Sequence, residues 1–340
     1  MLVRQKLGAI YRGFKNFYYR LSLSAIRFLI SFFNVGARLR LGYTSKFHQD
    51  GLGAQLQRVL AIQGLANFWK LQVLHQKVES ISVHPLDQIS TSLEIQNLNA
   101  EFNFLISATV ELDAANEIIY VDELKVRNLI NSIIRLQNNK SMSLLILLTH
   151  PYKFVDSMPT LYLNSIDQEF KRRLGSFINE DLTNSIAIHY RAGTGNYALQ
   201  PNQRISRQIR IENFTAPLIQ LLERTKFEKI VVYTDAPETP IIFYPPSSQR
   251  NSWQGLPGFD GESFDINAID FQDWIRSIPV EVSIKRGGNP IRSLANLSQA
   301  QGLVLSNSSF GYCAALLGLC QFVYLPKSFW HPKLPKWNYF

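Results

Sequence analysis

The chain has 340 residues, of which 46% are hydrophobic and 18% are charged, a composition that excludes a disordered protein. This length exceeds what one hydrophobic core usually supports, so we expect two domains. The net charge is +9, and the only two cysteines are Cys313 and Cys320. Their spacing within an apolar stretch favours two buried free thiols over a disulfide or a metal pair, which fits a reducing compartment.

The net charge comes entirely from the part of the chain before Asp50, which contains nine basic and no acidic residues. The rest of the chain has 26 basic and 26 acidic residues. Residues 1–38 form an arm with the pattern of an amphipathic helix. Its apolar face would hold Ile10, Phe14, Phe17, Tyr18, Leu21, Ala25, Phe28 and Leu29, and its opposite face Arg12, Lys15, Arg20 and Arg27.

A basic amphipathic helix with aromatic residues is typical of a segment that lies on an anionic membrane surface. Two alternatives stay open: the helix packs on the body of the protein, or residues 21–37 form a signal anchor, although this stretch is short and contains Arg27. Nucleic acid is not an expected partner, because the remaining chain is neutral and has no nucleic-acid motif. We expect a cytoplasmic, peripherally membrane-associated protein rather than one with a Golgi-type anchor.

After the arm, LRLGY at residues 39–43 predicts a strand, followed by a glycine-rich turn and a helix over residues 56–71. The turn brings together Asp50, Gly51, Gly53 and Gln55, which supply a flexible backbone, a carboxylate and an amide. Further strands are predicted at residues 104–110 and 144–148, and a helix at 126–136. The pattern loosens at residues 151–167, where a domain boundary is plausible.

The second half alternates strands with helices. The predicted strands are residues 185–189, 229–234, 280–284 and 303–305, and the predicted helices are residues 216–222, 292–301 and 311–318. A loop rich in proline, glycine and serine covers residues 237–261, and the tail from residue 326 to 340 is expected to be irregular. Alternation in both halves predicts two doubly wound α/β domains that face a cleft.

Three strand ends in this half carry residues suited to a phosphate ligand. The strand at residues 185–189 ends in His189 and Arg191 and opens into a glycine loop at Gly193, where an arginine is well placed to meet a diphosphate. The loop also spells GxGxxA, but Pro201 stands where a dinucleotide-binding helix should run, so we reject a nicotinamide or flavin site. The strand at residues 229–234 leads into Asp235, whose alternative role is to cap the next turn.

The third strand end is the most informative. Residues 303–305 form an apolar run that stops at Ser306 and is followed by Asn307, Ser308 and Ser309 before a helix of small residues. A helix N-terminus with hydroxyl groups favours anions, although serine and asparagine are also ordinary helix caps. The chain has no Asp-x-Asp pair for a metal-bound diphosphate and no histidine spacing for a metal.

In order along the chain, these segments resemble the GDP-fucose-dependent fucosyltransferase superfamily, closest to its α-1,2-fucosyltransferase-like branch. The family's Gly-x-Gly-Asn-Gln turn corresponds to GLGAQ at residues 51–55, and its His-x-Arg-Arg-Gly-Asp motif to HYRAGT at residues 189–194. The Ser-Asp-Asp strand end corresponds to TDA at residues 234–236. The final Asn-Ser-Ser-Phe-Ser-Trp-Trp-Ala-Ala motif corresponds to NSSFGYCAA at residues 307–315. The match covers roughly residues 40–320 and leaves out the arm.

The resemblance implies a GT-B-like fold with Rossmann-like domains. The arm would be residues 1–38, the acceptor-side domain 39–165, the nucleotide-sugar domain 166–325 and the irregular tail 326–340. It also implies a metal-independent, inverting transfer of fucose from GDP-fucose to a glycan hydroxyl. GDP-fucose would be the donor substrate, with no metal or other cofactor. A transferase for another nucleotide sugar, or a non-catalytic glycan- or partner-binding homologue at the membrane, are the alternatives.

By resemblance, Arg191 would grip the β-phosphate and stabilise the leaving diphosphate, with His189 and Asp235 near the guanine. The remaining donor-site residues would be Gly51, Gly53, Gln55, Gly193, Asn307, Ser308 and Ser309. We expect Asp50 to act as the catalytic base, because related protein O-fucosyltransferases carry an acidic residue at a similar place. The chain departs from the family at Ala192, which replaces the second arginine, and at Thr194, which replaces the aspartate unless Asn196 takes its place.

Overall fold

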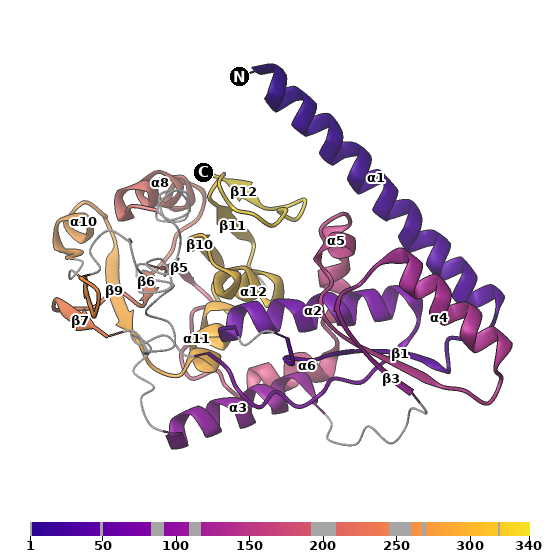
Figure 1. Ribbon diagram of the computed structural model, residues 1–340. Helices are drawn as coiled ribbons and strands as arrows, with labels where there is room; N and C mark the ends of the chain where they lie inside the picture. Colours follow the sequence, from indigo (N-terminus) through magenta and orange to yellow (C-terminus); the bar gives the residue numbers. More distant parts are fainter. Residues whose placement is uncertain are drawn as a thin grey trace. The chain divides into compact units, whose positions relative to one another are not determined.

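The structure is a computed structural model that describes residues 2–47, 50–82, 92–108, 117–191, 209–244, 260–266, 270–318 and 320–340 (Figure 1). The chain divides into two compact units. The first consists of Met1–Asp50, Ala54–Ile81 and Asn99–Arg173, and the second of Gly51–Gly53, Ser82–Leu98 and Leu174–Phe340. The chain thus leaves the first unit a little beyond the boundary predicted after residue 165.

The predicted N-terminal helix is present as α1 (Leu2–Phe32), which begins the first unit. The face that packs is not the predicted apolar face: it consists of Ser22, Leu23, Ile26 and Ile30. α1 packs against α4 (Val126–Asn138) and α5 (Tyr152–Val155). The predicted apolar face is instead exposed, with Phe14, Phe17, Tyr18, Leu21 and Phe28 all more than half accessible.

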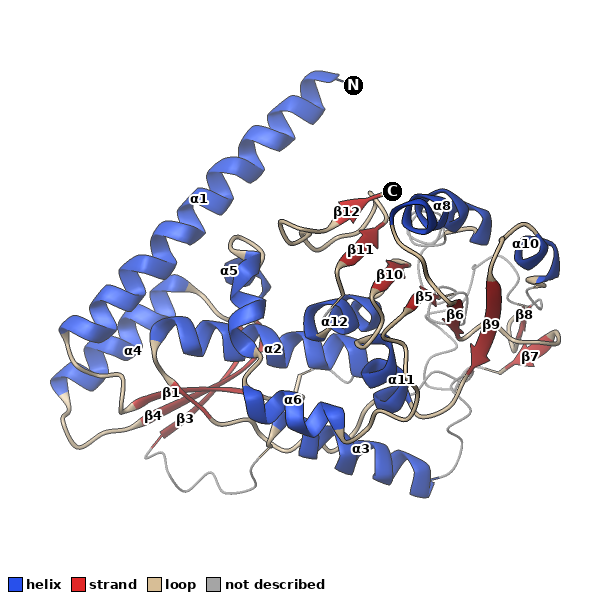
Figure 2. Cartoon of the chain, turned by 180° about the vertical axis from the view of Figure 1, so that it is seen from behind, coloured by secondary structure: helices blue, strands red, loops and turns tan. Residues whose placement is uncertain are grey.

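The first unit is built on a parallel four-stranded sheet in the order β2-β1-β4-β3 (Figure 2). Its strands are β1 (Leu39–Tyr43), β2 (Gln72–Val73), β3 (Glu117–Glu123) and β4 (Leu144–His150). β4 is buried up to Thr149, as its continuous apolar sequence requires in a parallel sheet. The other helical segments of the first unit are α2 (Leu52–Trp69), α3 (Ser92–Ile106), α6 (Gln168–Gly175) and the 3₁₀ helix η1 (Pro159–Ser165). Some residues of α2, α3 and α6 are assigned to the second unit.

The second unit contains a parallel six-stranded sheet in the order β12-β11-β10-β5-β6-β9. Its strands are β5 (Ser185–Tyr190), β6 (Lys229–Thr234), β9 (Glu281–Arg286), β10 (Gly302–Leu305), β11 (Phe322–Leu325) and β12 (Asn338–Tyr339). Numbered from β5 onward, this order is 6-5-4-1-2-3, the doubly wound Rossmann arrangement. The chain therefore reverses its winding direction between β5 and β10.

The described helices of this unit are α8 (Thr215–Arg224), α10 (Gln272–Arg276), α11 (Pro290–Leu297) and α12 (Ser309–Leu317), with the 3₁₀ helix η3 (Ile211–Phe214) before α8. β7 (Ile241–Phe243) pairs antiparallel with β8 (Phe264–Ile266) in a separate two-stranded sheet. α11 starts at Pro290 and ends at Leu297, earlier at both ends than the predicted helix over residues 292–301. Its start is set by Asn289, whose side chain accepts hydrogen bonds from the amides of Ile291 and Arg292, and by Pro290 after the cap.

The predicted α/β class with two Rossmann-like units is confirmed, and so is the helical arm. Both cysteines are free thiols. One predicted strand is wrong: residues 104–106 close α3, where Leu105 and Ile106 continue the helical burial pattern of Leu98 and Phe102 while Phe104 is exposed. The tail also differs from the expectation of an irregular segment, since β12 pairs in parallel with β11.

Candidate functional site

The predicted donor-site residues after β5, β6 and β10 lie along one edge of the second sheet, because parallel strands place their carboxyl ends together. β10 pairs directly with β5, with Leu305 opposite His189, and β6 pairs with β5 on the other side. The edge between β5 and β10 is the point where the winding reverses, and open α/β sheets bind their ligands at such a point. His189, Arg191 and residues 306–309 flank it.

His189 is held at this edge as a neutral imidazole. The Arg191 amide donates to Ser306 Oγ (3.1 Å), and Ser306 Oγ lies 3.2 Å from His189 Nδ1, so the hydroxyl links the histidine ring to the backbone of Arg191. Burial, with the nearby charge of Arg191, lowers the pKa of His189 to about 3. Sequence reasoning left Ser306 out of the site, although it is the first polar residue after the strand.

The start of α12 is built from the predicted Asn-Ser-Ser segment. Ser308 is the cap residue, and its hydroxyl accepts from the Phe310 amide at 3.2 Å. Asn307 donates its side-chain amide to Ser328 Oγ at 2.9 Å and so helps fix the corner, and Ser309 is the first residue of the helix. These residues leave a helix N-terminus beside Arg191, an arrangement that favours an anion.

The β6 end of the edge carries Asp235, which is partly exposed after Thr234. Next to it, the Arg286 guanidinium at the end of β9 donates to the Ala236 carbonyl at 2.8 Å and lies 5.1 Å from the Phe271 ring centroid. The sequence analysis did not single out Arg286, although it is a cation at the end of a strand and is followed by two glycines. Gly193 lies outside the described residues, as do Ala192, Thr194 and Asn196.

Gly53, in the first turn of α2, is placed where only glycine fits. A Cβ there would lie 2.5 Å from Phe310 Cα, and the Cys313 thiol donates to the Gly53 carbonyl at 3.4 Å. Both residues belong to the second unit, as does Gly51, which is partly buried. Gly53 of the predicted GLGAQ turn is thus required for close packing.

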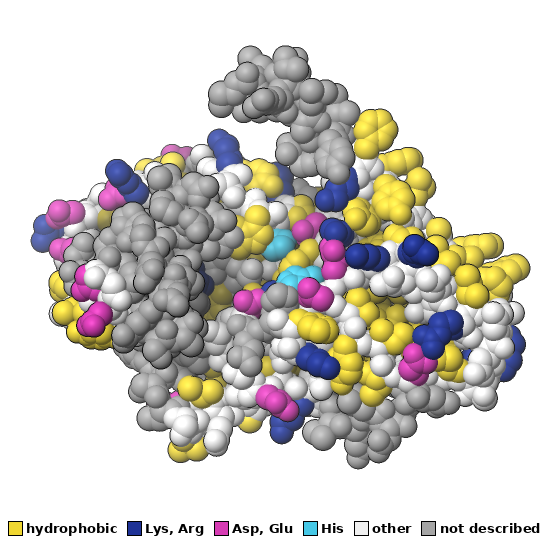
Figure 3. Space-filling view, in the orientation of Figure 1, with side chains coloured by type: hydrophobic (Ala, Val, Ile, Leu, Met, Phe, Trp, Pro, Cys, Tyr) yellow, Lys and Arg dark blue, Asp and Glu magenta, His cyan; other side chains and the backbone are white. Residues whose placement is uncertain are grey.

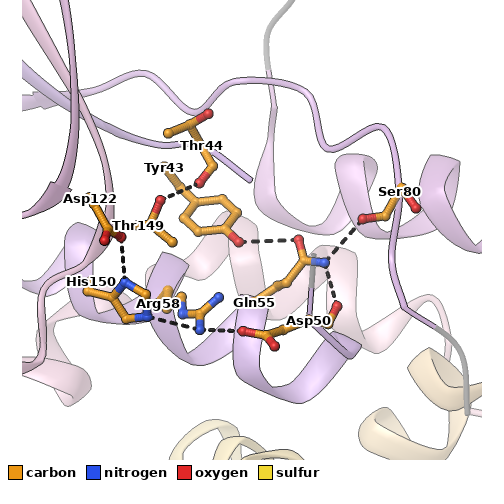
Figure 4. A network of polar contacts seen from close by, with 9 residues as sticks. All are labelled: Tyr43, Thr44, Asp50, Gln55, Arg58, Ser80, Asp122, Thr149 and His150. Carbon is orange, nitrogen blue, oxygen red and sulfur yellow. Dashed lines mark hydrogen bonds and ion pairs between the residues drawn. The ribbon is translucent and has the colours of Figure 1, made fainter. Parts of the chain in front are cut away.

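Asp50 and Gln55 lie in the first unit and belong to a polar network shown in Figure 4. Gln55 is fully buried and accepts from the Tyr43 hydroxyl (3.2 Å) while its amide donates to the carbonyls of Asp50 (2.7 Å) and Ser80 (3.3 Å). The amide therefore holds the Asp50 loop. Asp50 itself forms an ion pair with Arg58.

The same network contains three further residues that the sequence analysis did not select: Arg58, Asp122 and His150. His150 Nδ1 lies 2.8 Å from Asp122 Oδ1, and His150 Nε2 lies 3.2 Å from Arg58 Nη2. Burial lowers the pKa of Arg58, but the neighbouring Tyr152, Asp50 and Tyr43 raise it by more. The pKa of Arg58 is therefore raised overall, and its charge is permanent. Burial raises the pKa of Tyr43 to about 12 despite the charge of Arg58.

Two further features bear on the expected partners. Among the described residues, no three acidic, histidine or cysteine side chains are grouped so that they could hold a metal ion. Within the same part of the chain, no helix combines the length and the apolar character that a membrane span needs.

Comparison with known proteins gives structural matches only. No protein family and no curated protein sequence matches the chain. POFUT1 in complex with GDP matches with a TM-score of 0.43 and 8% identity, over 90% of this chain and 98% of that one. The E. coli heptosyltransferase WaaC with ADP-2-deoxy-2-fluoro heptose matches with a TM-score of 0.35 and 9% identity, over 89% of this chain and 93% of that one. At these identities and TM-scores, the matches carry no information about the activity of this chain.

Proposed function

We propose that this protein is an inverting glycosyltransferase that moves fucose from GDP-fucose to a glycan hydroxyl without a metal ion. The observation that carries the proposal is the second unit's sheet edge, where Arg191 after β5 and the start of α12 after β10 meet at the winding reversal. A diphosphate needs fixed positive charge and N–H donors, and both are present there.

In this proposal the leaving diphosphate is the group that the edge stabilises. Arg191 would hold β-phosphate oxygens with two hydrogen bonds. The N-terminus of α12, with Ser308 and Ser309, would stabilise the negative charge of the remaining phosphate oxygens. The neutral His189 ring can form a hydrogen bond without adding a second cation. Asp235 offers a carboxylate that suits the paired N–H donors of guanine.

The donor sugar has a second candidate. Ala192 and Thr194 stand where the resembling family has an arginine and an aspartate, so two charges are missing from the motif. This difference favours a related nucleotide sugar as the alternative donor. The same diphosphate-binding residues would serve it, because the diphosphate is common to nucleotide sugars.

The experiment that tests the proposal is GDP release from GDP-fucose, with GDP-mannose and UDP-sugars as alternative donors. We expect Arg191→Ala to reduce turnover by at least tenfold, because removing one donor to a developing oxyanion commonly costs that much or more. Arg191→Lys should recover part of it, since lysine keeps the charge but loses the paired N–H groups.

A matched control is Arg172→Ala, since Arg172 is an exposed cation of α6 bonded to Glu169. Unchanged turnover in Arg191→Ala would refute the site assignment. Binding of no GDP compound in a thermal-shift assay, in which a ligand of the native state must raise stability, would favour a non-catalytic homologue.

We further propose that α1 brings the enzyme to an anionic membrane surface. Its exposed face carries Phe14, Phe17, Tyr18, Leu21, Phe28 and Phe32. Figure 3 shows hydrophobic side chains gathered along the described part of this helix. Together with the excess of basic residues before Asp50, this face has the composition of an interfacial helix.

A further inference from the structure

The carboxyl edge of the first unit's sheet carries a chain of polar side chains that lies outside the proposed donor site (Figure 4). Asp122 is near the end of β3 and His150 ends β4, and these strands are neighbours, with Glu123 opposite His150. Arg58 comes from the second turn of α2, and Asp50 lies just before that helix. Ligands of parallel α/β sheets bind at this edge.

The hydrogen bonds that link Asp122, His150, Arg58 and Asp50 have only one consistent set of donors and acceptors. A guanidinium can only donate, so Arg58 Nη2 donates to His150 Nε2 at 3.2 Å and also to Asp50 Oδ2. The imidazole proton must then be on Nδ1, where it is donated to Asp122 Oδ1 at 2.8 Å. This arrangement requires His150 to be neutral.

Burial separates the roles of the four side chains. The Arg58 side chain is 6% exposed, whereas the Asp50 side chain is 43% exposed and can be reached by a substrate. Within the part of the chain that the structure describes, Arg58 Nε and Nη1 have no hydrogen-bond partner. Both contacts that orient the guanidinium therefore run through Nη2, one to His150 and one to Asp50.

We propose that the Asp122–His150 pair positions Asp50 for proton abstraction from the acceptor hydroxyl, by holding Arg58 in place while His150 is neutral. The inference rests on the proposed function. In that step a bond forms between the acceptor oxygen and the sugar carbon. The bond from this carbon to the diphosphate oxygen breaks, its electron pair leaves on the diphosphate, and the acceptor proton passes to the Asp50 carboxylate.

Protonation of His150 would undo this arrangement. The new Nε2–H would face Arg58, removing the acceptor and placing two cations together. Charged and titratable groups around the ring are Asp122 on β3, Arg58 on α2, and Tyr152 on α5, whose ring centroid is 5.9 Å away. The Glu123–Lys153 ion pair flanks them. Asp122 would keep its bond to the imidazolium, so the contact to Arg58 is the one that protonation breaks.

The tautomer is a test that needs no substrate. Nitrogen-15 NMR of the histidine rings in the full chain, at a pH where they are neutral, should show His150 with its proton on Nδ1. The signals can be assigned by their loss in His150→Gln. In Asp122→Asn this tautomer should lose its preference. A neutral His150 protonated on Nε2 would overturn the proposal.

Kinetics separate a positioning role from direct proton transfer. The assay is the release of GDP from GDP-fucose with water as the acceptor. In this assay, His150→Leu should lower kcat about tenfold and leave the donor KM unchanged, because Arg58 loses an oriented hydrogen bond. In His150→Gln the side-chain oxygen can still accept from Arg58, so kcat should fall by no more than about threefold.

Two results would contradict the proposal: His150→Gln as inactive as Asp50→Asn, which would make His150 the base, or wild-type kcat in His150→Leu. A wild-type protein that releases GDP from no nucleotide sugar refutes the proposed function. The tautomer measurement still decides whether the Asp122–His150–Arg58 chain exists.

Discussion

Gly311 is a position at which the sequence departs from the fucosyltransferase motif and the structure gives a reason. A Cβ at Gly311 would lie 3.0 Å from both His189 Nδ1 and Leu305 Cδ2. The His189 ring therefore occupies the space that a side chain at position 311 would need. The missing side chain and the buried histidine form one packing arrangement.

We predict that Gly311→Ala lowers the free energy of unfolding by about 1–2 kcal/mol, since the clash outweighs the helix propensity that alanine adds. Donor binding should weaken as well, because His189 must shift. The measurement is urea unfolding together with GDP titration. Gly175→Ala is the matched control, because a Cβ at this α6 position meets nothing within 4 Å. A destabilisation no larger than that of the control would contradict the predicted packing.

Two buried histidines make stability depend on pH. Burial lowers the pKa of His75 and of His189 from 6.5 to about 3, in the latter with help from Arg191. The unfolded chain therefore binds protons that the folded chain refuses between these pH values. Stability should be full above about pH 6.5 and should fall as the pH decreases toward 3.

Urea unfolding at pH 7.5 and pH 5 measures this dependence. The loss should be smaller in His189→Gln, which removes one of the titrating groups. Equal losses in the wild type and in both His189→Gln and His75→Gln would assign the acid sensitivity to other groups.

At the scale of elements, α1 shows why an amphipathic pattern alone does not identify the face that packs. The aromatic face is broad enough to dominate a helical projection, yet the line that packs is Leu23, Ile26 and Ile30. Arg20 Nε donates to the Ser157 carbonyl at 2.6 Å, and Arg27 lies 5.0 Å from the Phe68 ring centroid. The basic residues thus help to dock the helix, and the aromatic residues are left exposed.

We predict that Phe14→Ser, Phe17→Ser and Phe28→Ser combined lower binding to anionic phosphatidylserine vesicles at least tenfold, because each change removes exposed apolar area from the helix. Thermal stability should change little, since these side chains contribute no core packing. Co-sedimentation with vesicles measures the effect. Undiminished vesicle binding would contradict the proposed membrane role.

Leu23→Ser provides the contrasting control. Leu23 is fully buried, so this change should lower the free energy of unfolding by several kcal/mol, about 2–5 for a large buried side chain replaced by a small one. Deleting residues 1–38 would be a poor test, because it would also expose the surfaces of α4 and α5 that α1 covers.

The elements that the sequence predicted well have local signals. α11 has a capping asparagine and a proline at its start, and β4 is a continuous apolar run. The end of α3 was mispredicted as a strand, because a short, mostly apolar run such as residues 104–110 fits a buried strand as well as a helix. Only packing in three dimensions decides between the two. β11 and β12 were both missed, because β11 is only four residues long and β12 two, too short to show a strand pattern.

For the whole molecule, the doubly wound order of the second sheet explains why segments more than a hundred residues apart in sequence meet. β5 and β10 pair directly, so Arg191 and Ser306 come together although the sequence gives no sign of their adjacency. The Arg58–His150 and His150–Asp122 contacts have the same origin, because they join α2, β3 and β4. No local spacing rule could have found them.

The sequence by itself determined the α/β class, the basic helical arm and the strand ends that carry His189, Arg191, Asp235 and Ser308. Each of these follows from short-range hydrophobic periodicity, charge and capping chemistry. Only the tertiary structure decided which face of α1 packs, that Gln55 holds the Asp50 loop, and that Arg58, Asp122 and His150 form one network. These depend on which strands become neighbours and which side chains lose water, and both are properties of the folded chain.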